Sequence, residues 1–148
     1  MRTLCAELLP QALVVTPNIP EAEILTGLRI STLEHARDAA RRIVDMGASA
    51  VIVKGGHGAG DPIVDLLFAD GKFVEFRTAR IDTRQTHGTG CTFASAVAAH
   101  LALGCSLPEA TEYAQRYVAG AIRNGLPLGR GHGPLDHFWN RPLRSVRL

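Results

Sequence analysis

The sequence predicts an α/β fold with a mostly parallel sheet, flanking helices and one β-hairpin. Short β-branched apolar runs alternate with longer segments of helical periodicity, which is the pattern of strand–helix–strand units. Asp70-Gly71 lies between two apolar runs and is a strong hairpin signal. The length of 148 residues is that of one domain, residues 1–148, with a core of its own.

The first elements are a strand and two helices. Leu13–Val15 is a short apolar run that stops before Pro17, so we expect a buried strand there. Pro20–Glu23 opens a short helix, because proline and acidic residues favour a first turn. Ser31 and Glu34 have the spacing of a capping box, and a second helix is expected behind them. Its apolar face and terminal glycine are Leu33, Ala36, Ala40, Ile43, Val44 and Gly47.

The rest of the chain adds strands and two longer helices. The further strands are expected at Ala50–Val53, Val64–Phe68 and Phe73–Phe76. A helix with few charges is expected from Gly88 to Leu103, and Ser106 with Glu109 forms another capping box. The apolar face and end of the last helix are Leu107, Ala110, Ala114, Tyr117, Val118, Ala121, Ile122 and Gly125. The segment after it is predicted to be a loop.

Composition excludes several classes of protein. A net charge of +2 is too small to indicate binding to nucleic acid or to a membrane surface. Three cysteines without close spacing argue against a disulfide framework and for a reducing compartment, so a cytoplasmic location is expected. No secretory signal is recognisable, and the single histidines do not suggest a zinc site. The uncharged run Gln85–Pro108 contains glycines and hydroxyl residues, so it is predicted to be a buried helix rather than a membrane span.

The stretch T-H-G-T-G-C-T, residues 86–92, has the chemistry of an anion site. A helix N-terminus exposes backbone N–H groups and the positive end of the helix dipole. Gly88 and Gly90 let a ligand approach this backbone, and Thr89 and Thr92 add hydroxyls. The same dipole favours the thiolate form of Cys91, which can then accept a proton from a substrate hydroxyl. The structural alternative is a glycine turn into a buried helix with an inert cysteine.

Two further loops follow predicted strands. Asn18 and Glu21 offer an amide and a carboxylate to Mg²⁺ beside phosphates, or they form a helix-capping pair. Lys54 either pairs with nucleotide phosphates or simply leaves a sheet edge. The run Lys54-Gly55-Gly56 is not a P-loop, because that spacing is absent. Since ligands bind at the carboxyl ends of strands in open sheets, we expect these loops to converge on one edge.

A cysteine hydrolase or acyltransferase is an alternative of another class. His87 stands four residues before Cys91, so a nucleophile and a base are close in sequence. No third orienting residue is identifiable from the sequence.

Four segments together resemble the hydroxymethylpyrimidine/phosphomethylpyrimidine kinase family of thiamine biosynthesis. They are T-P-N-I-P-E-A-E-I-L-T-G (Thr16–Gly27), V-K-G-G-H (Val53–His57), T-H-G-T-G-C-T (Thr86–Thr92) and G-R-G-H-G-P-L-D-H-F (Gly129–Phe138). They cover nearly the whole chain in the family's order, which is much more specific than any one of them.

The resemblance implies a ribokinase-like fold that transfers the ATP γ-phosphate to 4-amino-5-hydroxymethyl-2-methylpyrimidine or to its monophosphate. By resemblance, Asn18 and Glu21 lie near Mg²⁺, and Lys54, Thr86 and His87 serve the nucleotide. Gly88, Thr89 and Gly90 match the family's anion hole. Cys91 stands at the position of the catalytic base.

The chain departs from the family in length, since members are about twice as long. It resembles the C-terminal half, with the ATP and base side of the site, and lacks the N-terminal half that binds the pyrimidine. Three interpretations remain open: a truncated product, a chain that forms a homo-oligomer or pairs with a chain supplying the missing half, or a non-catalytic nucleotide-binding remnant. A pyridoxine or pyridoxal kinase of the same superfamily is the alternative within the kinases.

Overall fold

The computed structural model describes residues 3–57 and 61–141. The chain forms two compact units, Met1–Arg80 and Ile81–Leu148, and each is described by itself. No helix in the described part of the chain, including the one within Gln85–Pro108, has the length and hydropathy needed to cross a membrane.

The first unit alternates helices and strands. Two short turns, a π-helical one at Leu4–Leu8 and a 3-10 one at Leu9–Gln11, precede helices α1 (Ile19–Thr26) and α2 (Leu33–Asp45). Strand β1 (Ala50–Val53), a 3-10 turn (Gly55–His57) and strands β2 (Ile63–Ala69) and β3 (Lys72–Thr78) follow. The hairpin prediction is confirmed, and Asp70 and Gly71 at its turn have φ angles of 50° and 70°.

The sheet is antiparallel, which corrects the prediction of a mostly parallel sheet. Its order is β1-β2-β3, and both neighbouring pairs run antiparallel, with Val51 opposite Phe68 in the first pair. The connections explain the error. The nine residues 54–62 join β1 to β2, and a two-residue turn joins β2 to β3. A parallel crossover needs a dozen or more residues, usually with a helix.

The expected strand Leu13–Val15 is reduced to an isolated parallel bridge beside β1. The Val15 N–H donates to the Ala50 carbonyl at 3.1 Å, and the Val15 carbonyl accepts from the Ile52 N–H at 2.8 Å. Pro17, two residues further on, has no N–H to extend the ladder. The parallel relation to β1 is therefore present, but only locally.

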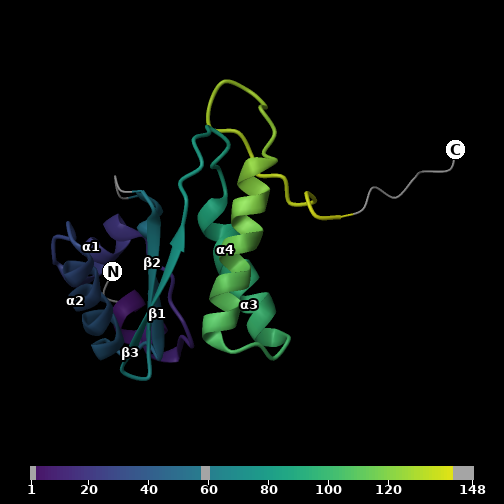
Figure 1. Ribbon diagram of the computed structural model, residues 1–148. Helices are drawn as coiled ribbons and strands as arrows, with labels where there is room; N and C mark the ends of the chain where they lie inside the picture. The colour runs from purple at the N-terminus through teal and green to yellow at the C-terminus, as the bar shows by residue number, and fades with distance from the viewer. Residues whose placement is uncertain (1–2, 58–60, 142–148) are drawn as a thin grey trace, which may run out of the picture. The chain divides into compact units, whose positions relative to one another are not determined.

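Helices α1 and α2 lie on one face of the sheet, as Figure 1 shows. Helix α2 packs against the sheet through its predicted amphipathic face, because its alanines and Ile43 are buried in a core shared with the strands. Each buried Å² of this apolar surface contributes roughly 25 cal/mol to folding. The buried core residues are Ala22, Ile30, Ala36, Ala39, Ala40, Ile43, Ala48, Val51, Val53 and Leu66.

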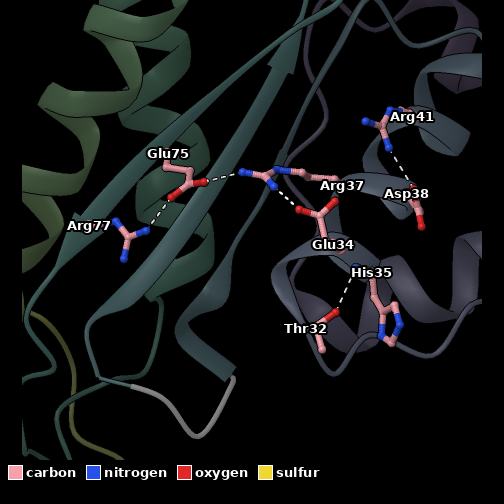
Figure 2. A network of polar contacts seen from close by, with 8 residues as sticks. All are labelled: Thr32, Glu34, His35, Arg37, Asp38, Arg41, Glu75 and Arg77. Atoms are coloured by element: carbon pink, nitrogen blue, oxygen red, sulfur yellow. Dashed lines mark hydrogen bonds and ion pairs between the residues drawn. The ribbon is translucent and has the colours of Figure 1, made fainter.

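Helix α2 is capped by Thr32 and not by the expected pair of Ser31 and Glu34. The Thr32 Oγ1 accepts a hydrogen bond from the His35 N–H at 3.2 Å (Figure 2). The Ser31 hydroxyl lies 3.2 Å from the His35 Nδ1 instead. The capping-box prediction was wrong here, because Thr32 supplies the same hydroxyl one residue closer to the helix.

An ion-pair network joins α2 to β3, as Figure 2 shows. The Arg37 guanidinium contacts the Glu34 carboxylate and donates to the Glu75 Oε1 at 2.7 Å. The Glu75 Oε2 accepts from Arg77 at 2.6 Å. The Arg37 guanidinium carbon also lies 5.8 Å from the centroid of the Phe73 ring. These contacts hold the helix against the strand at the rim of the core.

The second unit consists of helices α3 (Thr89–Ala102) and α4 (Leu107–Arg123), which pack side by side, and the segment after them (Figure 1). Both helices agree with their predicted bounds to within one or two residues. The Glu109 Oε2 accepts from the Ser106 N–H at 2.9 Å and from the Ser106 hydroxyl at 2.6 Å. These bonds, from the hydroxyl first and the backbone second, hold the pKa of Glu109 below its ordinary value.

The segment after α4 is a loop, as predicted, and it folds back along the helix. The Asp136 N–H donates to the Ala121 carbonyl at 3.1 Å, and the Tyr117 hydroxyl donates to the His137 carbonyl at 2.8 Å. The Trp139 ring lies directly over Gly120 of α4.

Candidate functional site

Asn18 and Glu21 form a capping box at the start of α1. The Asn18 Oδ1 accepts from the Glu21 N–H, and the Glu21 Oε2 accepts from the Asn18 N–H, each at 2.8 Å. The helix-capping role that the sequence analysis gave as an alternative for this pair is therefore present. The box uses one carboxylate oxygen of Glu21, whose side chain is exposed, and leaves its Oε1 available for a further ligand.

Lys54 lies beside Asn18 at the carboxyl end of β1. The two residues form a parallel bridge, and the Lys54 N–H donates to the Pro17 carbonyl at 2.8 Å. The loops after these two segments meet at one edge of the sheet, as expected, and the convergence of the loop before Gly88 with them stays a prediction.

Asp65 supports the Lys54 loop, and the sequence analysis did not identify it. It is only 7% exposed, and its Oδ1 accepts a hydrogen bond from the Gly55 N–H at 2.9 Å. The sequence did contain a signal for this role, since Asp65 is a single carboxylate inside the apolar run Val64–Phe68. A carboxylate that is buried in such a strand requires a hydrogen-bond partner.

The donor set at Asn18 and Glu21 fits a Mg²⁺ ion shared with water. One amide and one carboxylate oxygen are suitable ligands, since Mg²⁺ usually keeps several waters and shares phosphates with its protein site. The described residues contain no group of three or more His, Cys, Asp and Glu that could enclose a metal. Two protein oxygens would leave most coordination positions of such an ion to water or phosphate oxygens.

Helix α3 begins without a side-chain cap. Its N-cap, Gly88, has a φ of 89°, a left-handed conformation that glycine adopts without strain. The Gly90 and Cys91 N–H groups lie in the first turn, where a helix offers no partner four residues back. The Thr89 hydroxyl donates to the Thr86 carbonyl at 2.6 Å, and the Thr92 hydroxyl donates to the Gly88 carbonyl at 2.8 Å. The turn thus presents backbone donors to an anion, while these hydroxyl protons are used within it.

Cys91 is exposed and borders a hollow of about 560 Å³ in the second unit. The hollow is lined by Gly88, Cys91, Thr92, Ser95, Ala96, Ala99, His100, Tyr117 and His137. All three cysteines are free thiols, as expected. Among the described residues, no hydrogen bond joins the His87 imidazole to the Cys91 thiol.

Thr86 and His87 contact the segment after α4. The Thr86 Oγ1 lies 3.4 Å from the His132 Nδ1, and the His87 N–H donates to the Gly133 carbonyl at 3.2 Å. The predicted site residues are thus brought together in two groups. Asn18, Glu21 and Lys54 meet in the first unit, and Thr86 to Cys91 meet in the second.

Solved structures similar to this chain are kinases of small molecules. The pyridoxal kinase of Staphylococcus aureus, determined in complex with AMP-PCP, matches with a TM-score of 0.90 at 41% sequence identity. The match covers 95% of this chain and 52% of that one. The chain is therefore an α/β fragment of the ribokinase-like fold and spans about half of that kinase.

The sequence relatives define the family. The hydroxymethylpyrimidine/phosphomethylpyrimidine kinase of Bacillus subtilis strain 168 is 48% identical over 137 residues, which are 92% of this chain and 51% of the relative. The thiamine biosynthesis bifunctional protein ThiED of Geobacter sulfurreducens is 55% identical over 131 residues, 88% of this chain and 27% of the relative. The phosphomethylpyrimidine kinase family matches residues 1–136, and the chain belongs to this family. It spans about half the length of the Bacillus kinase.

Proposed function

We propose that this chain carries the nucleotide and proton-accepting side of a kinase that phosphorylates 4-amino-5-hydroxymethyl-2-methylpyrimidine, or its monophosphate, with ATP in thiamine biosynthesis. The observation that carries the proposal is the uncapped N-terminus of α3 with Cys91 exposed in its first turn. The identity of 48% to the Bacillus kinase supports the pyrimidine as acceptor. A cytoplasmic location agrees with three free thiols.

The proposed step is an in-line phosphoryl transfer. With the unphosphorylated pyrimidine as acceptor, its hydroxyl oxygen attacks the γ-phosphorus, the bond from this phosphorus to the β–γ bridging oxygen breaks, and ADP leaves. With the monophosphate, one of its phosphate oxygens attacks in the same way. The hydroxyl proton passes to the Cys91 thiolate, which acts as general base. The backbone N–H groups around Gly88, Thr89 and Gly90 stabilise the charge on the phosphoryl oxygens.

The remaining residues bind the nucleotide in this proposal. Lys54 pairs with the phosphates, and Thr86 and His87 shape the turn before α3. Asn18 and Glu21 would hold Mg²⁺, which when bound neutralises phosphate charge. Because each of these side chains contributes charge or geometry to ATP, nucleotide binding is expected from the residues present.

A pyridoxal kinase is the second candidate. The match to the Staphylococcus pyridoxal kinase, with a TM-score of 0.90 at 41% sequence identity, favours it. The two candidate functions differ in the molecule that accepts the phosphoryl group, so the identity of this acceptor distinguishes them. The chain spans 51% of the Bacillus kinase, so we propose that turnover requires a second polypeptide segment, from a partner or from another copy. Without such a complement, the chain is a nucleotide-binding protein.

Calorimetric titration of the purified 148-residue chain with Mg–ATP, followed by an ADP assay with the hydroxymethylpyrimidine or with pyridoxal, tests the proposal. Binding of Mg–ATP without turnover is the expected result for the chain alone. ADP formation with the pyrimidine would show that the chain forms a complete kinase site by itself or as an oligomer. ADP formation with pyridoxal alone would favour the second candidate. Absence of Mg–ATP binding would contradict the proposed function.

A further inference from the structure

The segment after α4 returns to the turn that precedes α3, and we propose that it positions the anion-binding end of that helix. We name Leu126–Asp136 the return segment and Arg84–Gly88 the entry turn. Gly133 and Gln85 are the positioning residues. The inference rests on the proposed function, because it concerns how the α3 amides are presented to nucleotide phosphates.

Both backbone groups of Gly133 bind the entry turn. The Gly133 N–H donates to the Arg84 carbonyl at 3.1 Å, and the Gly133 carbonyl accepts from the His87 N–H at 3.2 Å. A bridge between His87 and Pro134 continues this pairing in parallel. Since Gly88, the N-cap of α3, directly follows His87, these bonds set the direction of the chain one residue before the N-cap.

The close approach requires glycine on the return segment. A Cβ added to Gly133 would lie 2.6 Å from the Leu126 carbonyl oxygen and 3.1 Å from the Gln85 Cγ. The Gln85 side chain also lies close to Gly125, where an added Cβ would lie 2.5 Å from the Gln85 Cβ. Gln85 therefore approaches two glycines, and a side chain at either glycine position would collide with its neighbours.

The return segment is itself attached to α4. The Asp136 N–H donates to the Ala121 carbonyl of α4 at 3.1 Å, and within the segment the Leu126 N–H donates to the Pro134 carbonyl at 3.2 Å. Leu135 is buried between these points, with 4% of its surface exposed. The entry turn is therefore held by a rigid helix through this segment, and not only by its own local bonds.

Anion binding by backbone amides depends on their direction. The entry turn has a short bond of its own, from the Thr86 N–H to the Arg84 carbonyl at 3.0 Å. The bond from His87 to Gly133 adds the tertiary constraint. When this bond is lost, the first turn of α3 keeps its amides but holds them in several orientations, so the stabilisation of phosphate falls.

Gly133→Ala tests the inference, and Gly131→Ala is its matched control. Gly131 is an exposed glycine of the same segment, and a Cβ added there would meet no atom within 4 Å. The measurements are Mg–ATP affinity by calorimetry, exchange of the His87 amide hydrogen, the rate of Cys91 alkylation by iodoacetamide, and the melting temperature.

For Gly133→Ala, we expect Mg–ATP affinity to fall at least tenfold, His87 amide exchange to accelerate, and the alkylation rate of Cys91 to change severalfold. Gly131→Ala should match the unaltered chain. Gln85→Ala removes the inserted side chain without adding an atom, and a smaller change in the same direction is expected. This variant decides the question if Gly133→Ala does not fold.

Unchanged Mg–ATP affinity with faster His87 exchange would overturn the inference, because the segment would then serve stability alone. If the unaltered chain does not bind Mg–ATP, the proposed function fails instead. In that case, the proposed positioning of α3 by the return segment is tested by His87 amide exchange and Cys91 alkylation alone. Equal rates of both processes in the Gly133→Ala and Gly131→Ala variants would overturn the proposal.

Discussion

The Asp65 carboxylate accepts a hydrogen bond from the Gly55 N–H at 2.9 Å, which ties strand β2 to the loop that carries Lys54. Asp65 is buried among apolar residues of its strand, where an ionised group without partners is costly. The buried position of Asp65 is explained by the Lys54 loop, because the Asp65 carboxylate is the acceptor for the Gly55 N–H in that loop.

Asp65→Ala should therefore destabilise the first unit. Loss of the acceptor leaves the Gly55 N–H without this bond, and we expect the free energy of unfolding to fall by about 1–3 kcal/mol. Urea denaturation measures the change. Asp45→Ala, an exposed aspartate at the end of α2, should stay within roughly 0.5 kcal/mol of the unaltered chain. Equal effects of the two substitutions would disprove a specific role for Asp65.

Lys54→Ala should weaken Mg–ATP binding. A charge-assisted bond to phosphate contributes roughly 1.5–3 kcal/mol, so we expect a loss of about tenfold or more in affinity by calorimetry. Lys72 is the other lysine of the chain and lies exposed at the start of β3. Lys72→Ala is thus the control and should bind normally. If both variants bind alike, Lys54 does not contact the nucleotide.

Cys91→Ala should abolish phosphoryl transfer in an active assembly while Mg–ATP binding persists. Removal of a general base typically lowers the rate by about 10²–10⁴-fold. An assembly with the complementary half of a relative, assayed for ADP, gives the rate. Cys105→Ala removes a half-buried thiol just before α4 and should retain activity. Full turnover by the Cys91 variant would show that another group takes the proton.

The Arg37–Glu75 pair should couple more strongly than the Arg41–Asp38 pair. The side chains of the first pair are 28% and 23% exposed, and those of the second are 50% and 59% exposed. Water screens the second pair more, so its coupling should be near zero, and that of the first about 0.5–1 kcal/mol. Double-mutant cycles with urea denaturation measure both. A larger coupling for the exposed pair would contradict this reading of the network.

Glu109 should make the stability of the chain depend on pH. The bonds from Ser106 lower its pKa in the folded state, so its stabilising effect is complete above the ordinary pKa of a glutamate. The effect is lost as the pH falls through the lowered value. Glu109→Gln should therefore reduce the melting temperature at neutral pH, and the difference should close in acid. Glu112→Gln, on the same helix and exposed, is the comparison variant.

Local signals predicted the elements of this protein well. Asp70-Gly71 produced the hairpin, because both residues tolerate the positive φ that its turn requires. Gly88 and Ser106 marked the starts of α3 and α4, because each is the N-cap residue of its helix and can be recognised from its immediate neighbours in the sequence. The motifs around Asn18, Lys54 and Cys91 also led to the kinase family, since each is a short stretch whose order along the chain can be read directly.

Tertiary structure decided what depends on partners far apart in sequence. Strand direction followed from connection lengths, and the bond from Asp65 to Gly55 followed from the placement of β2. The contacts of Gly133 with the entry turn join residues almost fifty positions apart, so no local sequence pattern predicts them. Local sequence was enough to place most helices and strands and to assign the family, but not to predict the cap of α2 or the single bridge at Val15. Only the folded chain determined how its loops are held, because a hydrogen bond between distant segments forms only after both have been placed by packing.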